Sequence, residues 1–268
     1  MIVFRDPAEV PPGFGPSVVV IGKFDGVHSG HRAVIARARV KAVSMGATVV
    51  AVTFDRNPLA LLAPDKCPEN LIGVNQKVRL LADTGVDAVL VLRFDEDLAS
   101  LEADEFARLV LVDTLAAQAV LVGADFRFGR GGAGTAESLT ALGLSHGFDV
   151  DVVHDVRAAD RGRRVSSTWI RELLSSGDVA GARKLLGRDH SVVGEVVHGL
   201  KRGREIGYPT ANLSPDLEGF VPADGVYAGW LIDEADASGL RPGIRYPAAI
   251  SIGTNPTFDD VCLLYTSR

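Results

Sequence analysis

The chain has 268 residues, of which 47% are hydrophobic and 23% charged, and its formal net charge is −6. This composition excludes intrinsic disorder and predicts one large or two modest globular domains. The acidic balance argues against a nucleic-acid binder, and two distant cysteines exclude a disulfide framework. Uncharged stretches reach only about 13 residues and no basic, apolar leader is visible, so we expect no membrane span, no secretory signal and a cytoplasmic location. The sequence leaves self-association open.

The first part of the chain alternates strand-like and helix-like segments. The expected strands are Ser17–Ile21, Thr48–Phe54, Ala88–Leu92, Ala119–Val122 and Val150–Val153. The expected helices are Gly30–Ser44, Asn75–Asp83, Ala103–Ala117 and Ala136–His146. Short continuous apolar runs are typical of strands buried on both faces. The alternation therefore predicts an α/β domain with a doubly wound parallel sheet.

The character of the sequence changes after about Gly187. The segments SVVGEVVHGL, YPTANL, GVYAGWLI and YPAAISIG read as strands punctuated by Gly and Pro, with no convincing helix between them. This pattern predicts a separate antiparallel β module, such as a barrel. A short helix within Ser175–Arg188 would bridge the two parts. We therefore expect domains at residues 1–187 and 188–268.

A pair of histidines follows the first expected strand, in the segment Gly22–His31. Glycines here allow tight turns and close approach of a ligand to the backbone, and a helix N-terminus attracts phosphate. His28 and His31 are three residues apart and can lie on the same side of the helix start, where both could donate hydrogen bonds to one phosphate. The alternatives are a structural turn with two unrelated histidines or a zinc site. Zinc is disfavoured because no cysteine or third histidine lies nearby.

A second basic segment, Arg161–Arg171, opens another expected helix. Its hydroxyl residues Ser166, Ser167 and Thr168 are good N-cap residues, and arginines surround them. Hydroxyls, free N–H groups and guanidinium groups together suit a polyphosphate. An ordinary capped helix with solvated arginines is the alternative.

Two further loops follow the second and fourth expected strands, at Phe54–Pro58 and Gly123–Gly132. The second loop combines two aromatic residues with glycines and arginines, which could flank a planar ring and a phosphate. Taken alone, each loop is better explained as structural than as functional.

The sequence resembles the bacterial bifunctional riboflavin kinase/FAD synthetase family. The matching strings are GKFDGVHSGH, TFDRNP, VGADFRFG, VSSTWIREL, GEVVHGLKRGREIGYPTANL, PADGVYAGW and SIGTNPTF, which occur in the family's order over nearly the whole chain. The resemblance implies that the N-terminal domain transfers AMP from ATP to FMN, giving FAD and pyrophosphate, with Mg²⁺ neutralising part of the charge. The small-molecule partners would be ATP, FMN and riboflavin.

The resemblance also implies roles for individual residues of the first domain. His28, His31 and Arg171 would be catalytic. ATP would be bound by Gly22, Lys23, Phe24, Asp25, Gly30, Ser166, Ser167 and Thr168. The flavin would be bound by Asn57, Pro58, Asp125, Phe126 and Phe128.

The C-terminal module resembles the riboflavin kinase barrel. By that resemblance Gly203, Gly207 and Pro209 bind the nucleotide, and Thr210 and Asn212 bind Mg²⁺. The match stops near Phe258, short of the family's remaining strands and catalytic acid. We therefore expect an incomplete antiparallel barrel with a foreign tail at 262–268, and AMP transfer without riboflavin kinase activity.

Other functions are weighed against this interpretation. A related nucleotidylyltransferase could use another acceptor, such as pantetheine phosphate or a nicotinate nucleotide, but would have no reason to carry the PTAN module. A class I aminoacyl-tRNA synthetase core is disfavoured by the acidic charge. A non-catalytic flavin- or nucleotide-binding fragment is the third alternative.

Overall fold

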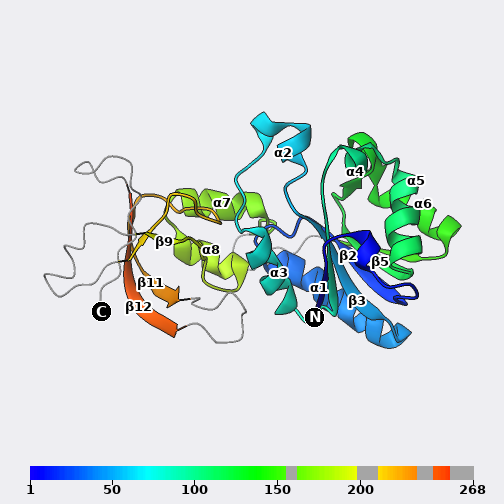
Figure 1. Ribbon diagram of the computed structural model, residues 1–268, viewed down its shortest axis with the longest axis horizontal. Coiled ribbons are helices and arrows are strands. Elements are labelled where there is room, and N and C mark those ends of the chain that lie inside the picture. Colours follow the sequence, from blue (N-terminus) through cyan, green and yellow to red (C-terminus); the bar gives the residue numbers. More distant parts are fainter. Residues whose placement is uncertain (155–161, 198–210, 234–243, 254–268) are drawn as a thin grey trace, which may run out of the picture. The chain divides into compact units, whose positions relative to one another are not determined.

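The computed structural model describes residues 1–154, 162–197, 211–233 and 244–253. The chain divides into two compact units (Figure 1). The first comprises Met1–Trp169 with Leu185–Gly187, and the second comprises Ile170–Lys184 with Arg188–Arg268. No helix in the described ranges has the length and apolar character needed to cross a membrane.

The first unit is built on a six-stranded parallel sheet with the strand order β1-β4-β3-β2-β5-β8. The strands are β1 (Ile2–Phe4), β2 (Ser17–Ile21), β3 (Thr48–Phe54), β4 (Ala88–Leu92), β5 (Ala117–Gly123) and β8 (Asp149–Val153). From β2 the chain proceeds outward to β3 and β4 on one side, and then to β5 and β8 on the other. The direction therefore reverses between β2 and β5, and ligands of open α/β sheets bind at the carboxyl ends of strands at such a point.

Helices cover both faces of this sheet (Figure 1). The first unit contains α1 (Ser29–Met45), α2 (Leu59–Leu62), α3 (Val74–Ala82), α4 (Glu96–Ser100), α5 (Ala103–Phe106) and α6 (Ala136–His146). Short 3-10 turns occupy Pro7–Glu9, Pro64–Lys66 and Arg130–Gly132. Val19 and Ile21 of β2 belong to the core that includes residues of α5 and α6, whereas α1 contacts the sheet with other buried residues. Alternate residues of each strand thus serve two cores.

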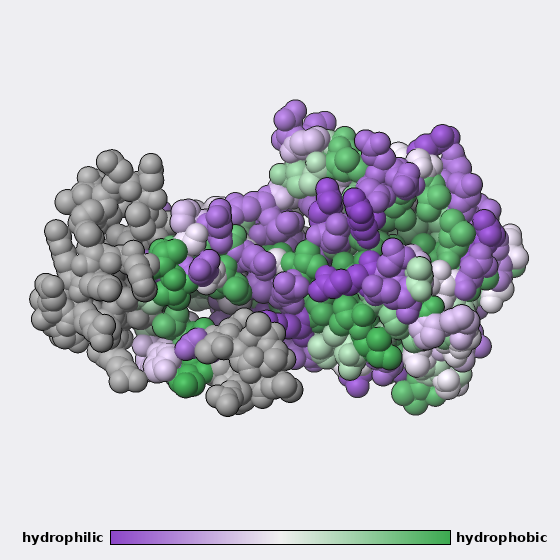
Figure 2. Space-filling view, in the orientation of Figure 1, coloured by the Kyte–Doolittle hydropathy of each residue, from purple (hydrophilic) through white to green (hydrophobic). Residues whose placement is uncertain are grey.

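The fully apolar strands explain why the sheet is central. All five residues of β2 and all five of β4 are buried. Figure 2 shows hydrophobic and hydrophilic residues interspersed over the visible surface of the first unit. The apolar runs of the sequence thus form strands that are buried on both faces, and the expected doubly wound α/β domain is confirmed.

The sequence pattern predicts β2, β3, β4 and α6 with their observed bounds. The expected single helix Ala103–Ala117 is wrong in detail, because the α-helix ends at Phe106, a π-helical stretch continues over Ala107–Thr114, and β5 begins at Ala117. Strand β1 and the hairpin of β6 (Arg127–Phe128) and β7 (Gly134–Thr135) are not predicted. These strands are only two or three residues long, too short for a periodic signal.

The second unit combines helices with antiparallel strands. Helix α7 (Ser167–Ser175) begins in the first unit and continues into the second, where α8 (Val179–Leu186) follows. Strand β9 (Val196–Val197) pairs with β10 (Asn212–Leu213), and β11 (Gly225–Asp233) pairs with β12 (Ile244–Ile252). The antiparallel arrangement is confirmed, but the described strands form two separate pairs and do not close a barrel.

The bridging helix predicted within Ser175–Arg188 is shorter than that range. Gly177 adopts a positive φ of 80°, and Asp178 Oδ1 accepts a hydrogen bond of 2.7 Å from the backbone N–H of Gly181. These two features end one helix and start the next, so α8 begins only at Val179.

Candidate functional site

The loop between β2 and α1 has an unusual backbone. Phe24 and Val27 have positive φ angles of 47° and 40°, although neither is glycine, and both are buried. Gly26 has φ 85°, and a Cβ atom there would lie 2.9 Å from Leu71 Cδ1. Strained, over-determined backbone of this kind is concentrated at ligand-binding sites. The loop at the carboxyl end of β2 is therefore held in one conformation.

His28 is the N-cap of α1. Its Nδ1 accepts a hydrogen bond of 3.4 Å from the backbone N–H of His31. The two imidazole rings stack with centroids 3.7 Å apart at 17°, and Phe24 contacts His31 edge-on at 5.2 Å. Since Nδ1 of His28 is an acceptor, the proton of the neutral ring is on Nε2. The structure thus brings the predicted His28 and His31 together at a helix N-terminus.

His31 is held uncharged. Burial lowers its pKa well below 6.5, and the neighbouring His28 together with the positive charges of Arg164, Lys77 and Lys23 lowers it further. Nδ1 of His31 is buried and has no hydrogen-bond partner in the part of the chain that the structure describes. An anion bound here would offset the surrounding cations and accept hydrogen bonds from the imidazoles.

The start of α7 contacts the same loop. Ser167 Oγ donates a hydrogen bond of 2.7 Å to the backbone carbonyl of Asp25, 142 residues away in sequence. Ser166 Oγ accepts one of 3.2 Å from the backbone N–H of Trp169, and the guanidinium of Arg163 lies 5.0 Å from the Trp169 ring centroid. The two predicted phosphate sites, at the starts of α1 and α7, therefore adjoin.

The loop after β5 reaches this region through an ion pair. Arg164 Nη2 donates to Asp125 Oδ2 at 2.9 Å. Although burial raises the pKa of Asp125, the hydrogen bond and charge of Arg164 hold that pKa below its ordinary value. Phe126 and Phe128 stack with ring centroids 5.3 Å apart. Phe128 is buried in the core, and Phe126 is only partly buried.

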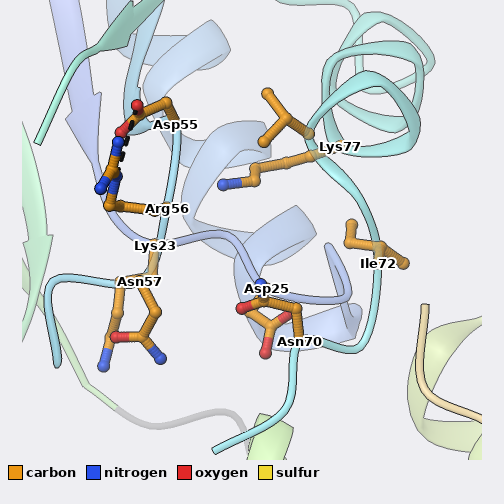
Figure 3. Close-up of a pocket in the computed structure, with 9 residues that line it drawn as sticks. Lys23, Asp25, Asp55, Arg56, Asn57, Asn70, Ile72 and Lys77 are labelled. Carbon is orange, nitrogen blue, oxygen red and sulfur yellow. Dashed lines mark ion pairs between the residues drawn. The ribbon is translucent and has the colours of Figure 1, made fainter. Parts of the chain in front are cut away.

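A pocket of about 330 Å³, which includes open solvent at its mouth, lies beyond the carboxyl ends of β2 and β3 (Figure 3). Its lining is Lys23, Asp25, Asp55, Arg56, Asn57, Asn70, Ile72, Val74 and Lys77. Lys23 and Asp25 are predicted ATP-site residues, and Asn57 is predicted for the flavin. The structure brings these three residues to one pocket. The neighbouring Pro58 is the N-cap of α2.

Lys77 is a pocket residue that sequence reasoning missed. Its Nζ donates to the Phe54 carbonyl at 2.8 Å and to Thr53 Oγ1 at 3.4 Å, and the residue is only 7% exposed. Burial lowers its pKa to about 8, against the raising effect of Asp25 and Asp55. The available signal was a lysine four residues before the buried Leu81, on the apolar side of a helix.

The other predicted residues do not line this pocket. Thr168 is exposed on α7, and Arg171 follows it by three residues on the same helix. Asn212 is buried in β10, and its Oδ1 has no hydrogen-bond partner among the described residues, which suits an oxygen ligand for a hard cation. Gly203, Gly207, Pro209 and Thr210, together with the tail at 262–268, lie outside the described residues.

Known proteins resemble the chain over most of its length. The FAD synthetase family matches residues 12–169, and the riboflavin kinase family matches residues 186–265. The bifunctional riboflavin kinase/FMN adenylyltransferase of Escherichia coli K12 is 40% identical over 240 residues, which cover 90% of this chain and 74% of that protein. The Bacillus subtilis protein of the same name is 35% identical over 243 residues, covering 90% and 73%.

A solved structure from Streptococcus pneumoniae, described as a macrolide-efflux protein, has a TM-score of 0.79 and 33% identity. It covers 98% of this chain, and the match covers 82% of that one. Two family matches in sequence order and these relatives together settle the assignment. The chain belongs to the bifunctional riboflavin kinase/FMN adenylyltransferase family.

Proposed function

We propose that the chain transfers AMP from ATP to FMN, giving FAD and pyrophosphate. The observation that carries the proposal is the contact between the two helix starts, in which Ser167 donates to the carbonyl of Asp25 beside the stacked His28 and His31. Two helix N-termini, two imidazoles and nearby arginines form a site for several phosphates of one ligand. ATP has that chemistry.

In the proposed reaction a phosphate oxygen of FMN attacks the α-phosphorus of ATP. A new P–O bond forms, the bond between the α-phosphorus and the bridging oxygen breaks, and pyrophosphate leaves with the electron pair. No covalent enzyme intermediate is needed, because the FMN phosphate is already a nucleophile. Catalysis is then alignment and charge stabilisation.

His28 and His31 act as donors to the phosphates of ATP. The N-cap bond to Nδ1 of His28 leaves Nε2–H as the donor of its neutral ring. The lowered pKa of His31 keeps its ring uncharged in the absence of substrate. Because a bound polyanion favours positive charge nearby, ATP binding would favour the protonated form of His31. Both imidazoles would stabilise charge that develops around the α-phosphorus.

The other predicted residues divide between the two substrates. Lys23, Asp25, Ser167, Thr168 and Arg171 are assigned to ATP with the backbone of Gly22, Phe24 and Gly30 and the cap of Ser166. Asn57, Pro58, Asp125, Phe126 and Phe128 are assigned to the flavin. The presence of Lys23, Asp25 and Asn57 in one pocket supports a shared reaction centre.

The second module, residues 188–268, is proposed to be of the riboflavin kinase barrel type. Asn212 with Thr210 would hold Mg²⁺, and the unpartnered Oδ1 of Asn212 fits that role. When bound, Mg²⁺ supplies charge neutralisation on the nucleotide phosphates. The match of the riboflavin kinase family to residues 186–265 supports riboflavin phosphorylation as the second activity. We also propose a cytoplasmic location and no nucleic-acid partner, on the basis of the composition and the net charge of −6.

One assay tests both half-reactions. The purified chain is incubated with Mg-ATP and either FMN or riboflavin, and the flavin products are separated by chromatography. The proposal predicts FAD from FMN, with phosphopantetheine and nicotinate mononucleotide inert as acceptors. FMN binding without turnover would instead favour a sensor, and adenylylation of another acceptor would reassign the substrate.

A further inference from the structure

The pocket at the ends of β2 and β3 contains a buried lysine that the family strings do not include. Lys77 extends from α3 toward the end of β3 (Figure 3). It donates to the Phe54 carbonyl and to Thr53 Oγ1, at the last two positions of that strand. Two of its three N–H donors are thus used within the described residues, and the third has no partner there. The side chain therefore ties α3 to the strand end from which Asp55 and Asn57 extend.

Two carboxylates line the same pocket and cannot easily turn away. Asp25 Oδ1 accepts from the backbone N–H of Leu71 at 2.8 Å, and Asp55 Oδ1 accepts from that of Phe94 at 2.9 Å. Left unbalanced, their negative charges would repel an anionic ligand. The pocket has two other cations. Arg56 Nε lies 3.6 Å from Asp55 Oδ2, and the Arg56 side chain is half exposed. Lys23 is exposed. Lys77 is the buried cation of the lining.

We propose that Lys77 is a positioning residue for AMP transfer: it fixes the end of β3 and neutralises Asp25 and Asp55, so that a phosphate-bearing acceptor can enter the pocket. The inference rests on the proposed function for the identity of that acceptor. In this role Lys77 acts through the attraction between its ammonium and the two carboxylates that share the pocket with it. Asp25 and Asp55 are both partly buried, so the loss of a buried cation beside them should affect the pocket more than the loss of an exposed one.

The variants Lys77→Met, Lys77→Arg and the double variant Lys77→Met/Asp55→Asn separate this role from a structural one. Asn at position 55 can still accept from Phe94, so the double variant changes charge and keeps the hydrogen bond. We expect Lys77→Met to raise KM for FMN about tenfold or more, with a smaller change in kcat. Lys77→Arg should stay within about threefold of the parent, and the double variant should recover most of the loss.

Lys41→Met is the matched control. Lys41 pairs with Asp149 at 3.4 Å near the other end of α1, and its replacement should leave KM for FMN unchanged. An unchanged KM for FMN in a folded Lys77→Met protein would overturn the inference. A double variant as weak as Lys77→Met would overturn the charge-balancing role. If Lys77→Met does not fold, Lys77→Gln carries the same test.

Failure of the proposed function has a different signature. In that case the parent chain makes no FAD, and FMN affinity is then measured directly by quenching of flavin fluorescence. Weaker FMN binding by Lys77→Met than by the parent and by Lys41→Met would still support the role of Lys77. Equal affinities in all three proteins would contradict it.

Discussion

The imidazole of His28 caps the helix that carries His31: its Nδ1 accepts the backbone N–H of His31 at 3.4 Å while the two rings stack at 3.7 Å. One side chain thus serves helix stability through Nδ1 and, in the proposed reaction, charge stabilisation through Nε2. These two contributions can be separated, because asparagine is a good N-cap residue and lacks the imidazole.

We predict that His28→Asn keeps the free energy of unfolding close to that of the parent, whereas His28→Ala lowers it by about 1 kcal/mol. Both variants should lose about a hundredfold in the rate of FAD formation. Urea unfolding and a chromatographic rate assay measure the two effects. Full activity in His28→Asn would show that the imidazole has no part in the reaction.

A second prediction concerns pH and His31. The folded pKa lies well below the ordinary value of 6.5, so the unfolded chain binds a proton that the folded chain resists. Stability is therefore unaffected above about pH 6.5 and falls as the pH is lowered below it. We expect His31→Gln to lose less free energy of unfolding between pH 7.5 and pH 5.5 than the parent.

Part of the acid sensitivity should remain in that variant. Burial also lowers the pKa of His190, although its Nε2 donates a hydrogen bond of 2.6 Å to the Phe220 carbonyl. Urea titrations at the two pH values supply the comparison. Identical losses in parent and His31→Gln proteins would mean that His31 is not held neutral by the fold.

A third prediction tests the contact between the two helix starts. Ser167→Ala removes the donor to the Asp25 carbonyl and should cost about 1 kcal/mol of stability. Because this bond positions the start of α7 against the histidine loop, kcat/KM for FAD formation should also fall, by about tenfold. The control is Ser44→Ala, which removes an exposed hydroxyl that donates to the Lys41 carbonyl near the end of α1. Equal catalytic effects from the two substitutions would contradict the positioning role.

A fourth prediction follows from the pKa of Lys77, which burial lowers to about 8. The groups that influence it are Asp25 and Asp55, and Lys23, Arg56 and His31 lie around the same site. As pH rises through about 8 the ammonium loses its proton and no longer balances the carboxylates. KM for FMN should therefore rise between pH 7 and pH 9 in the parent but not in Lys77→Arg, whose guanidinium stays charged. Parallel profiles for both proteins would refute this account.

The sequence was sufficient to predict the sheet but not its edges. Strands β2, β3 and β4 are apolar on both faces, and such runs have few alternatives to a buried parallel strand. Strand β1 is three residues long, and its place beside β4 depends on tertiary contacts. The π-helical turn over Ala107–Thr114 depends on how the chain fits between α5 and β5, which local propensity does not encode.

The same division holds for the site. The spacing of His28 and His31 predicts that both lie on the same side of the helix start, and the structure stacks them. The neutral state of His31 was not predictable, because it depends on burial and on Arg164 and Lys77 from distant segments. The partner of Ser167 is a backbone carbonyl, which carries no side-chain signature in the sequence.

The most direct test of the account follows the fate of two labels. The chain is incubated with FMN, Mg²⁺ and ATP carrying ³²P at either the α- or the γ-position, and the products are separated. The account predicts that the α-label enters FAD and that the γ-label appears in pyrophosphate in an equal amount. His28→Asn should lower the rates of formation of both labelled products to the same extent. Formation of no labelled FAD, or transfer of the γ-label to the flavin alone, would contradict AMP transfer at the histidine site.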